Sequence, residues 1–188
     1  MRLAYTALER VAIVLASLAL SVGLIALLSG FFAGRDQAGI SGGAPGPGKA
    51  FGDQGSALLQ LGHARPVYDS NPPTSGAHFP QPVLRDESEL NNDQLLGALA
   101  AGDVVIMYGG RTPPPGLKAL ADTVGSPFTA PLAAAGQAVI LAHRPGTTGL
   151  IGLAWAHIVR VAGPQDPLLK QFAGFWLARG APRGARSS

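Results

Sequence analysis

The sequence contains no cysteine, and this absence removes several classes of function at once. Disulfide bonds, thiolate metal sites and a cysteine nucleophile are excluded, because each of them needs a cysteine sulfur. Lipid attachment to a cysteine, as in lipoproteins, is excluded for the same reason. The absence does not place the chain in the cytoplasm, since exported domains also omit cysteine.

Charged residues are scarce as well, at 13% of the chain, and their signs nearly cancel. The 14 lysines and arginines against 11 aspartates and glutamates give a net charge of +3. Nucleic acid is therefore not expected as a partner, because its recognition needs a dense basic patch. Hydrophobic residues make up 47% of the 188 residues, which is enough for the packed core of one modest domain.

A long apolar run stands near the start of the chain. Residues 11–32 contain no charged side chain, and at about 1.5 Å per helical residue they span about 33 Å, enough to cross a bilayer. A cleavable signal peptide would have a shorter apolar region followed by a cleavage site of small residues, whereas this run ends with Phe31-Phe32 before Ala33. The run predicts an uncleaved, single-pass signal anchor, with the lipid bilayer as its partner, residues 1–10 in the cytoplasm and the larger C-terminal part outside.

Composition divides the rest of the chain into three parts. Residues 33–52 are rich in glycine and proline and predict a flexible linker. Residues 53–179 have the composition of a globular domain, and residues 180–188 form a polar tail that is expected to be disordered.

Within the domain, hydrophobic patterns predict a helix, strand, helix, strand, strand, helix order. The elements are expected at residues 92–101, 103–108, 115–123, 138–143, 150–161 and 167–178. A right-handed crossover would make the first two strands parallel, and a hairpin between the last two would add an antiparallel strand. The expected fold class is α+β, with a small mixed sheet in a layered α/β domain.

The most distinctive loop lies between Tyr68 and Phe79. It contains Pro72, Pro73, Thr74, Ser75, Gly76 and His78. The two prolines exclude a helix, and Gly76 provides the freedom that a tight reversal needs. Two interpretations stay open: a rigid structural loop whose histidine binds a backbone carbonyl, or a loop that presents a functional histidine.

Several segments resemble a bacterial family of unknown function. The similar segments are residues 68–79, 102–108, 140–145, 153–155, 172–176 and 179–182. Members of that family are typically membrane-anchored extracytoplasmic domains with a PPTSG-x-His signature. The resemblance covers roughly residues 53–182, and it implies a location at the bacterial cytoplasmic membrane, with the C-terminal domain outside.

The departures from the family pattern concern its polar cluster. The resemblance implies a Leu-Glu-His-Gly segment where this chain has Leu99-Ala100-Ala101-Gly102, a further histidine at Gly97, and another near Leu58. Only His78 of that cluster is retained, which makes the chain a divergent member. One imidazole cannot hold a metal alone, so a zinc or copper site would need His143 and His157, which the predicted hairpin places on paired strands.

These observations favour a non-catalytic role. Ser75 and His78 are three residues apart, yet no orienting acid or oxyanion donors can be assigned to them, and no phosphate-binding motif occurs. The sequence assigns no catalytic residue and no cofactor. The expected function is an extracytoplasmic accessory or interaction domain of a larger membrane assembly, with other membrane or extracytoplasmic proteins as partners. The alternative is a metal- or ligand-binding domain that uses His78 with His143 and His157.

Overall fold

The computed structural model describes residues 46–182. The predicted N-terminus and membrane anchor (residues 1–32), the linker up to residue 45 and the tail from residue 183 lie outside the described residues. Within residues 46–182, no helix is long and apolar enough to span a bilayer.

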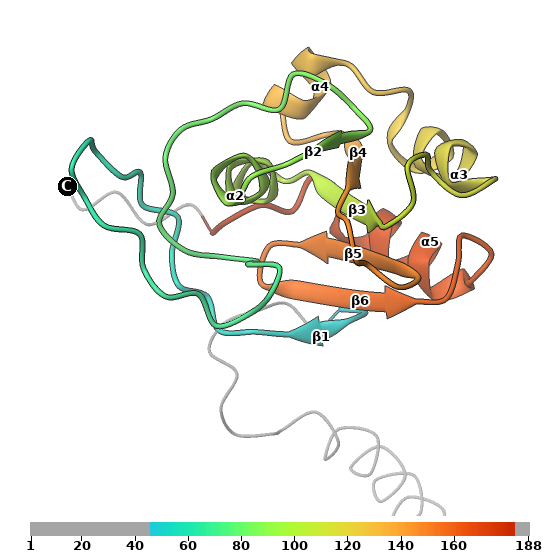
Figure 1. The fold of residues 1–188 in the computed structure, drawn as a ribbon, viewed down its shortest axis with the longest axis horizontal. Coiled ribbons are helices and arrows are strands. Elements are labelled where there is room, and N and C mark those ends of the chain that lie inside the picture. The colour runs from blue at the N-terminus through green and yellow to red at the C-terminus, as the bar shows by residue number, and fades with distance from the viewer. Residues whose placement is uncertain (1–45, 183–188) are drawn as a thin grey trace, which may run out of the picture. The chain divides into compact units, whose positions relative to one another are not determined.

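The domain is built on one mixed sheet of six strands in the order β1-β6-β5-β3-β4-β2 (Figure 1). The strands are β1 Lys49–Ala50, β2 Ser88–Glu89, β3 Val104–Tyr108, β4 Val139–His143, β5 Leu150–Ala154 and β6 His157–Val161. β3 runs parallel to β4 and antiparallel to β5. The expected mixed α/β layer is therefore confirmed.

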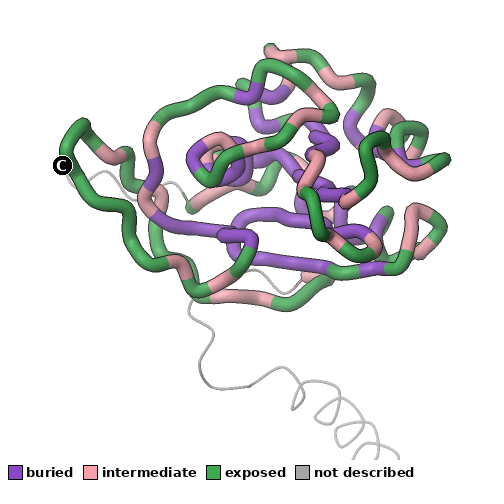
Figure 2. The backbone as a smooth tube through the Cα atoms, viewed as in Figure 1, coloured by how far each residue is buried: buried purple, intermediate pink, exposed green. Residues whose placement is uncertain are grey.

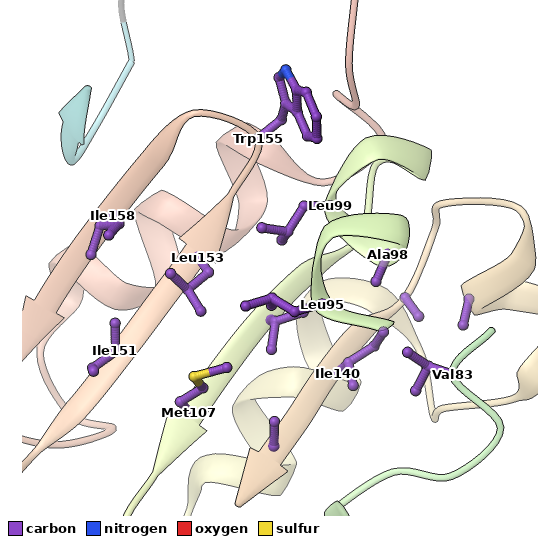
Figure 3. Packing of buried hydrophobic residues seen from close by; sticks show 14 of the residues in the cluster. Val83, Leu95, Ala98, Leu99, Met107, Ile140, Ile151, Leu153, Trp155 and Ile158 are labelled. Carbon is purple, nitrogen blue, oxygen red and sulfur yellow. The ribbon is translucent and has the colours of Figure 1, made fainter. Parts of the chain in front are cut away.

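Helices cover both faces of the sheet. The helices are α2 Asn92–Ala101, α3 Leu117–Gly125, α4 Ala130–Ala134 and α5 Pro167–Trp176. α2 and α4 contribute to one hydrophobic core, and Figure 3 shows Leu95 and Leu99 of α2 above the strands that carry Met107, Ile140 and Leu153. α3 and α5 contribute to the second core on the opposite face. Because both faces are covered, all five residues of β3 are buried, as its continuous apolar run predicts.

Local signals set the ends of the two longest helices. Asn91 caps α2, forming a reciprocal capping box with Gln94, and Gly102 ends the helix with φ 121°. Asp166 caps α5, where it accepts a hydrogen bond from the backbone N–H of Leu168, and proline follows in the first turn. Both helices were predicted with nearly these bounds.

The region predicted as one strand over 150–161 is instead a hairpin of β5 and β6. The two strands pair antiparallel and are joined by Trp155 and Ala156, which has φ 57°. The predicted hairpin between β4 and β5 is wrong, because β3 lies between them. The turn between β5 and β6, at Trp155 and Ala156, contains neither glycine nor proline. The apolar sequence there therefore gives no local sign that the chain reverses direction.

The folded domain begins before residue 53, where the sequence analysis placed its start. β1 pairs with β6, and Trp176 Nε1 donates a hydrogen bond to the carbonyl of Pro47 at 2.9 Å. At the other end, the N–H of Ala181 donates to the carbonyl of Ala100. Residues 46–52 and 180–181, predicted as linker and tail, thus contact the domain.

Candidate functional site

The PPTSG loop (residues 71–78) is packed against the hairpin turn between β5 and β6. Pro72 to Gly76 are all buried, and Thr74 and Ser75 have no exposed surface. The carbonyl of Thr74 accepts a hydrogen bond from the N–H of Ala156 at 3.0 Å. The loop is therefore part of the domain interior, a position that its two prolines and glycine did not by themselves predict.

The loop also holds the segment that precedes it in the chain. Ser75 Oγ donates to the carbonyl of Gly52 at 2.9 Å and accepts from the N–H of Gln54 at 3.1 Å. The N–H of Gly76 donates to the carbonyl of Gly55 at 2.8 Å. The buried Ser75 hydroxyl is therefore hydrogen-bonded both as a donor and as an acceptor, and its proton is directed to the Gly52 carbonyl.

Gly76 allows Tyr68 to close over the loop. Its φ is 127°, and a Cβ at this position would lie 2.8 Å from Tyr68 Cε1. Tyr68 in turn donates its hydroxyl to the carbonyl of Ala77 at 3.0 Å. The glycine is needed for its backbone conformation and also for the space above it.

Replacing Gly76 by alanine is expected to destabilise the domain by about 2–3 kcal/mol, from backbone strain together with displacement of Tyr68. Gly55→Ala is the matched control, since Gly55 also has a positive φ (77°) but nothing within 4 Å of an added Cβ. Chemical denaturation of both variants measures the difference. Equal losses of stability would contradict the role given to the Tyr68 contact.

His78 is buried at 3% exposure and has a fixed orientation. Its Nδ1 lies 3.0 Å from the carbonyl oxygen of Gly76. Because a carbonyl only accepts, Nδ1 donates, and in the neutral ring Nε2 carries the lone pair. Gly97 of α2 faces this nitrogen, with an added Cβ 3.8 Å from Nε2, and Leu58 forms a β-bridge with His78. Two positions at which the family resemblance implies histidines thus lie beside His78.

An ion pair that the sequence analysis missed lies next to this histidine. Asp93, in the first turn of α2 and 2% exposed, binds Arg65 and accepts the N–H of Phe79 at 3.1 Å. The hydrogen bond from Arg65 lowers the pKa of the Asp93 carboxyl, and it raises that of the guanidinium. The guanidinium also lies 5.1 Å from the ring of Phe79. In the sequence, Asp93 is recognisable only as an acidic residue in the first turn of a helix. Its ion pair with Arg65, 28 positions earlier, was therefore not predicted.

The structure does not bring His78, His143 and His157 together. His143 Nδ1 contacts Glu89 at 3.3 Å, whereas His157 stacks on Trp176 with ring centroids 3.8 Å apart. His143 and His157 do not lie on paired strands, because β3 and β5 separate β4 from β6. Three strand spacings correspond to about 14 Å, too far for one metal ion. Within residues 46–182, no cluster of three potential metal ligands is present.

The chemistry available around His78 is limited by these contacts. Ser75 Oγ bonds to backbone groups and His78 Nδ1 to the carbonyl of Gly76, so the two side chains do not form a nucleophile and base pair with each other. Burial lowers the pKa of His157, which favours its neutral ring within the aromatic stack. The arrangement orders a loop, and it places the imidazole Nε2 of His78 beside Gly97 of α2.

Comparison with known proteins identifies a family to which this chain is similar. No curated protein and no solved structure matches the chain significantly. A family described as "Protein of unknown function (DUF3105)" matches residues 63–187, which include the PPTSG loop and every element from β2 to α5. Since the match covers well over half of the sequence, the chain belongs to this family of unknown function.

Proposed function

We propose that the chain is a non-catalytic interaction domain, anchored to the outer face of a bacterial cytoplasmic membrane, that binds another protein of a membrane assembly. Its contact surface would be residues 53–67, which we call the exposed loop. The observation that carries the proposal is the exposure of Leu58, Leu61 and Val67, at 63%, 97% and 91%.

These three side chains form an unusual concentration of exposed apolar surface. Among the described residues, the other large exposed hydrophobic side chains are Leu84 and Leu168. Single exposed leucines are common on soluble domains, but several within one short segment are typical of a contact surface. Burial of Leu61 and Val67 against a partner would contribute roughly 1.5–3 kcal/mol for each side chain.

The exposed loop is held at both ends and free between them. At its start, the PPTSG loop binds Gly55 and Ala57 through backbone hydrogen bonds from Gly76 and His78. At its end, Arg65 is tied to Asp93. Figure 2 shows the loop between these attachments as a mostly exposed segment that extends from the rest of the domain. A loop fixed in this way presents its apolar side chains with a small loss of conformational entropy on binding.

The retained PPTSG loop fits this role. The side chain of its buried Ser75 bonds to the backbone of Gly52 and Gln54. The backbone of His78 bonds to that of Ala57 and Leu59, and these bonds position the exposed loop. The membrane location is supported by the uncharged residues 11–32 and by the family resemblance. A tether at the membrane would raise the effective concentration of the domain near other membrane proteins.

The test uses the full chain in its native membrane. Extraction in a mild detergent followed by size analysis and protein identification should recover the chain in a complex larger than its monomer. The double substitution Leu61→Asp with Val67→Asp should release it as a monomer, because losing both contacts weakens binding by roughly two orders of magnitude or more. Leu84→Asp is the matched control, since Leu84 is 68% exposed and lies outside the exposed loop.

Thermal unfolding of the variants separates lost binding from lost folding. The double variant should unfold at the wild-type temperature, because neither side chain is packed. The proposal would be refuted by a wild-type chain that extracts only as a monomer, or by a double variant that remains in the complex.

A further inference from the structure

Two arginines that are distant from Asn71 in the sequence contact this residue at the start of the PPTSG loop. Arg144 Nη2 donates to Asn71 Oδ1 at 2.7 Å, and Arg160 Nη2 donates to the carbonyl oxygen of Asn71 at 3.0 Å. Arg144 follows β4, and Arg160 lies on β6. A single neutral residue therefore accepts hydrogen bonds from two guanidinium groups.

These positive charges are not neutralised within the domain. Among the ion pairs of residues 46–182, none includes Arg144 or Arg160. Asp69, two residues before Asn71, accepts a hydrogen bond from the N–H of Gly52. Two guanidinium groups bound to the same residue repel each other, so the pair gains stability from an anion that binds to both.

A third cation lies on the same face of the sheet. Lys49 is opposite Ile158 in the antiparallel pair of β1 and β6, so the two side chains share a face. Arg160 is two residues beyond Ile158 and shares that face as well. The Cα atoms of Lys49 and Arg160 are thus diagonal neighbours, about 7–8 Å apart. The Lys49 ammonium itself lies 4.9 Å from the ring centroid of Phe51, so the cation-rich edge around Asn71 comprises Arg144 and Arg160.

The donors that remain suit a phosphate group. Each guanidinium carries five N–H donors, and the hydrogen bond to Asn71 uses one of them. Arg160 and Asn71 are exposed and Arg144 is partly exposed, so an anion can reach the pair from solvent. A carboxylate has two oxygens and is satisfied by one guanidinium fork, whereas a phosphate offers oxygens to two forks at once.

We propose that Asn71, Arg144 and Arg160 form a binding site for a phosphate group. In this site Asn71 sets the position of the two guanidinium groups, and the arginines bind the phosphate oxygens. The phosphate can belong to an anionic phospholipid headgroup or to a soluble compound. The site needs neither the exposed loop nor a protein partner, so it is independent of the proposed function.

The test measures binding of defined probes to the purified full chain in a neutral detergent. Titration calorimetry with inorganic phosphate, and with micelles containing phosphatidylglycerol or phosphatidylcholine, should show saturable binding of at least one phosphate-bearing anion. The double substitution Arg144→Gln with Arg160→Gln should weaken it at least tenfold. Lys170→Gln is the control, because it removes one exposed positive charge from α5 on the opposite face.

A measurement on the wild-type chain covers the case in which the double variant does not fold. The side-chain N–H resonances of Arg144 and Arg160 should shift as the bound anion is added. Binding of phosphatidylglycerol without inorganic phosphate identifies a lipid headgroup, and binding of inorganic phosphate without a preference for phosphatidylglycerol identifies a soluble ligand. Absence of binding to both anions, unshifted arginine resonances, or a folded double variant that binds like the wild type overturns the proposal.

Discussion

Phe172→Ala is expected to lower the free energy of unfolding by about 3–5 kcal/mol, a large part of the stability of a domain of this size. Phe172 has no exposed surface and lies at the centre of the core between α5 and the sheet. Its ring touches the backbone of two segments. A Cβ on Gly48 would lie 2.7 Å from Phe172 Cε2, and one on Gly152 would lie 3.3 Å from Cδ1. The truncation leaves a cavity that neither glycine can fill.

The same substitution should also loosen the entry of the chain into the domain. Gly48 precedes β1, so loss of the ring removes the surface on which the segment before Lys49 rests. Chemical denaturation of the full chain in a neutral detergent measures the effect. Both tryptophans of the chain, Trp155 and Trp176, lie in the described domain, so fluorescence reports on its unfolding.

Phe175→Ala is the matched control, because it makes the same truncation on the same helix. Phe175 is only partly buried, packs at the edge of Trp176 and carries Arg179 over its ring. Its loss should cost clearly less than that of Phe172, by at least about 1 kcal/mol. A loss at Phe175 that equals or exceeds the loss at Phe172 would contradict the assignment of the core.

The three longer helices and the central strands could be predicted because their signals are local, whereas the five-residue helix α4 was not predicted. Asn91 and Asp166 are capping residues placed directly before apolar periodic segments, and Gly102 ends α2. β3 and β4 are short apolar runs between turn residues. The helix between them implied a right-handed crossover and therefore parallel strands, and the two strands are indeed parallel.

Strand order and the contacts that depend on it could not be predicted in the same way. The sequence of Trp155 and Ala156 carries no turn signal, so β5 and β6 were read as one strand and β5 was paired with β4. That error placed His143 beside His157, although two strands separate them. Local patterns describe one segment at a time, whereas strand order depends on packing between segments distant in sequence.

The candidate site shows the same division. The stiffness of the PPTSG loop and the position of His78 against a backbone carbonyl follow from residues close in sequence. The contacts of Asp93 with Arg65 and of Asn71 with Arg160 join residues 28 and 89 positions apart. Such pairs have no sequence pattern of their own, because opposite charges and amides occur throughout any chain.

Asp103 is a buried acid whose charge should make the stability of the domain depend on pH. It lies just before β3 and is 1% exposed. Its Oδ1 accepts the N–H of Ala138 at 2.8 Å, while Oδ2 has no hydrogen-bond partner among the described residues. Burial raises the pKa of this carboxyl from 3.8 to about 7, and the hydrogen bond from Ala138 opposes part of that rise.

The direction of the pH effect follows from this raised pKa. Between pH 3.8 and about 7 the folded domain holds a proton on Asp103 that the unfolded chain has released. The contribution of Asp103 to the free energy of unfolding therefore has its full value below about pH 4. It falls as the pH rises from about 4 to about 7, and it stays constant above that. A difference of about three pKa units corresponds to roughly 4 kcal/mol.

Asp103→Asn should remove this dependence, because an amide keeps the shape and an oxygen acceptor for Ala138 without ionising. At pH 8 the variant should be more stable than the wild type by up to about 4 kcal/mol, and near pH 4 the two should be nearly equal. Denaturation at several pH values measures the difference. Asp122→Asn, the same change on α3 outside the core, should keep the wild-type pH profile. If the difference between Asp103→Asn and the wild type were the same at pH 4 and pH 8, Asp103 would not be the group whose ionisation weakens the fold.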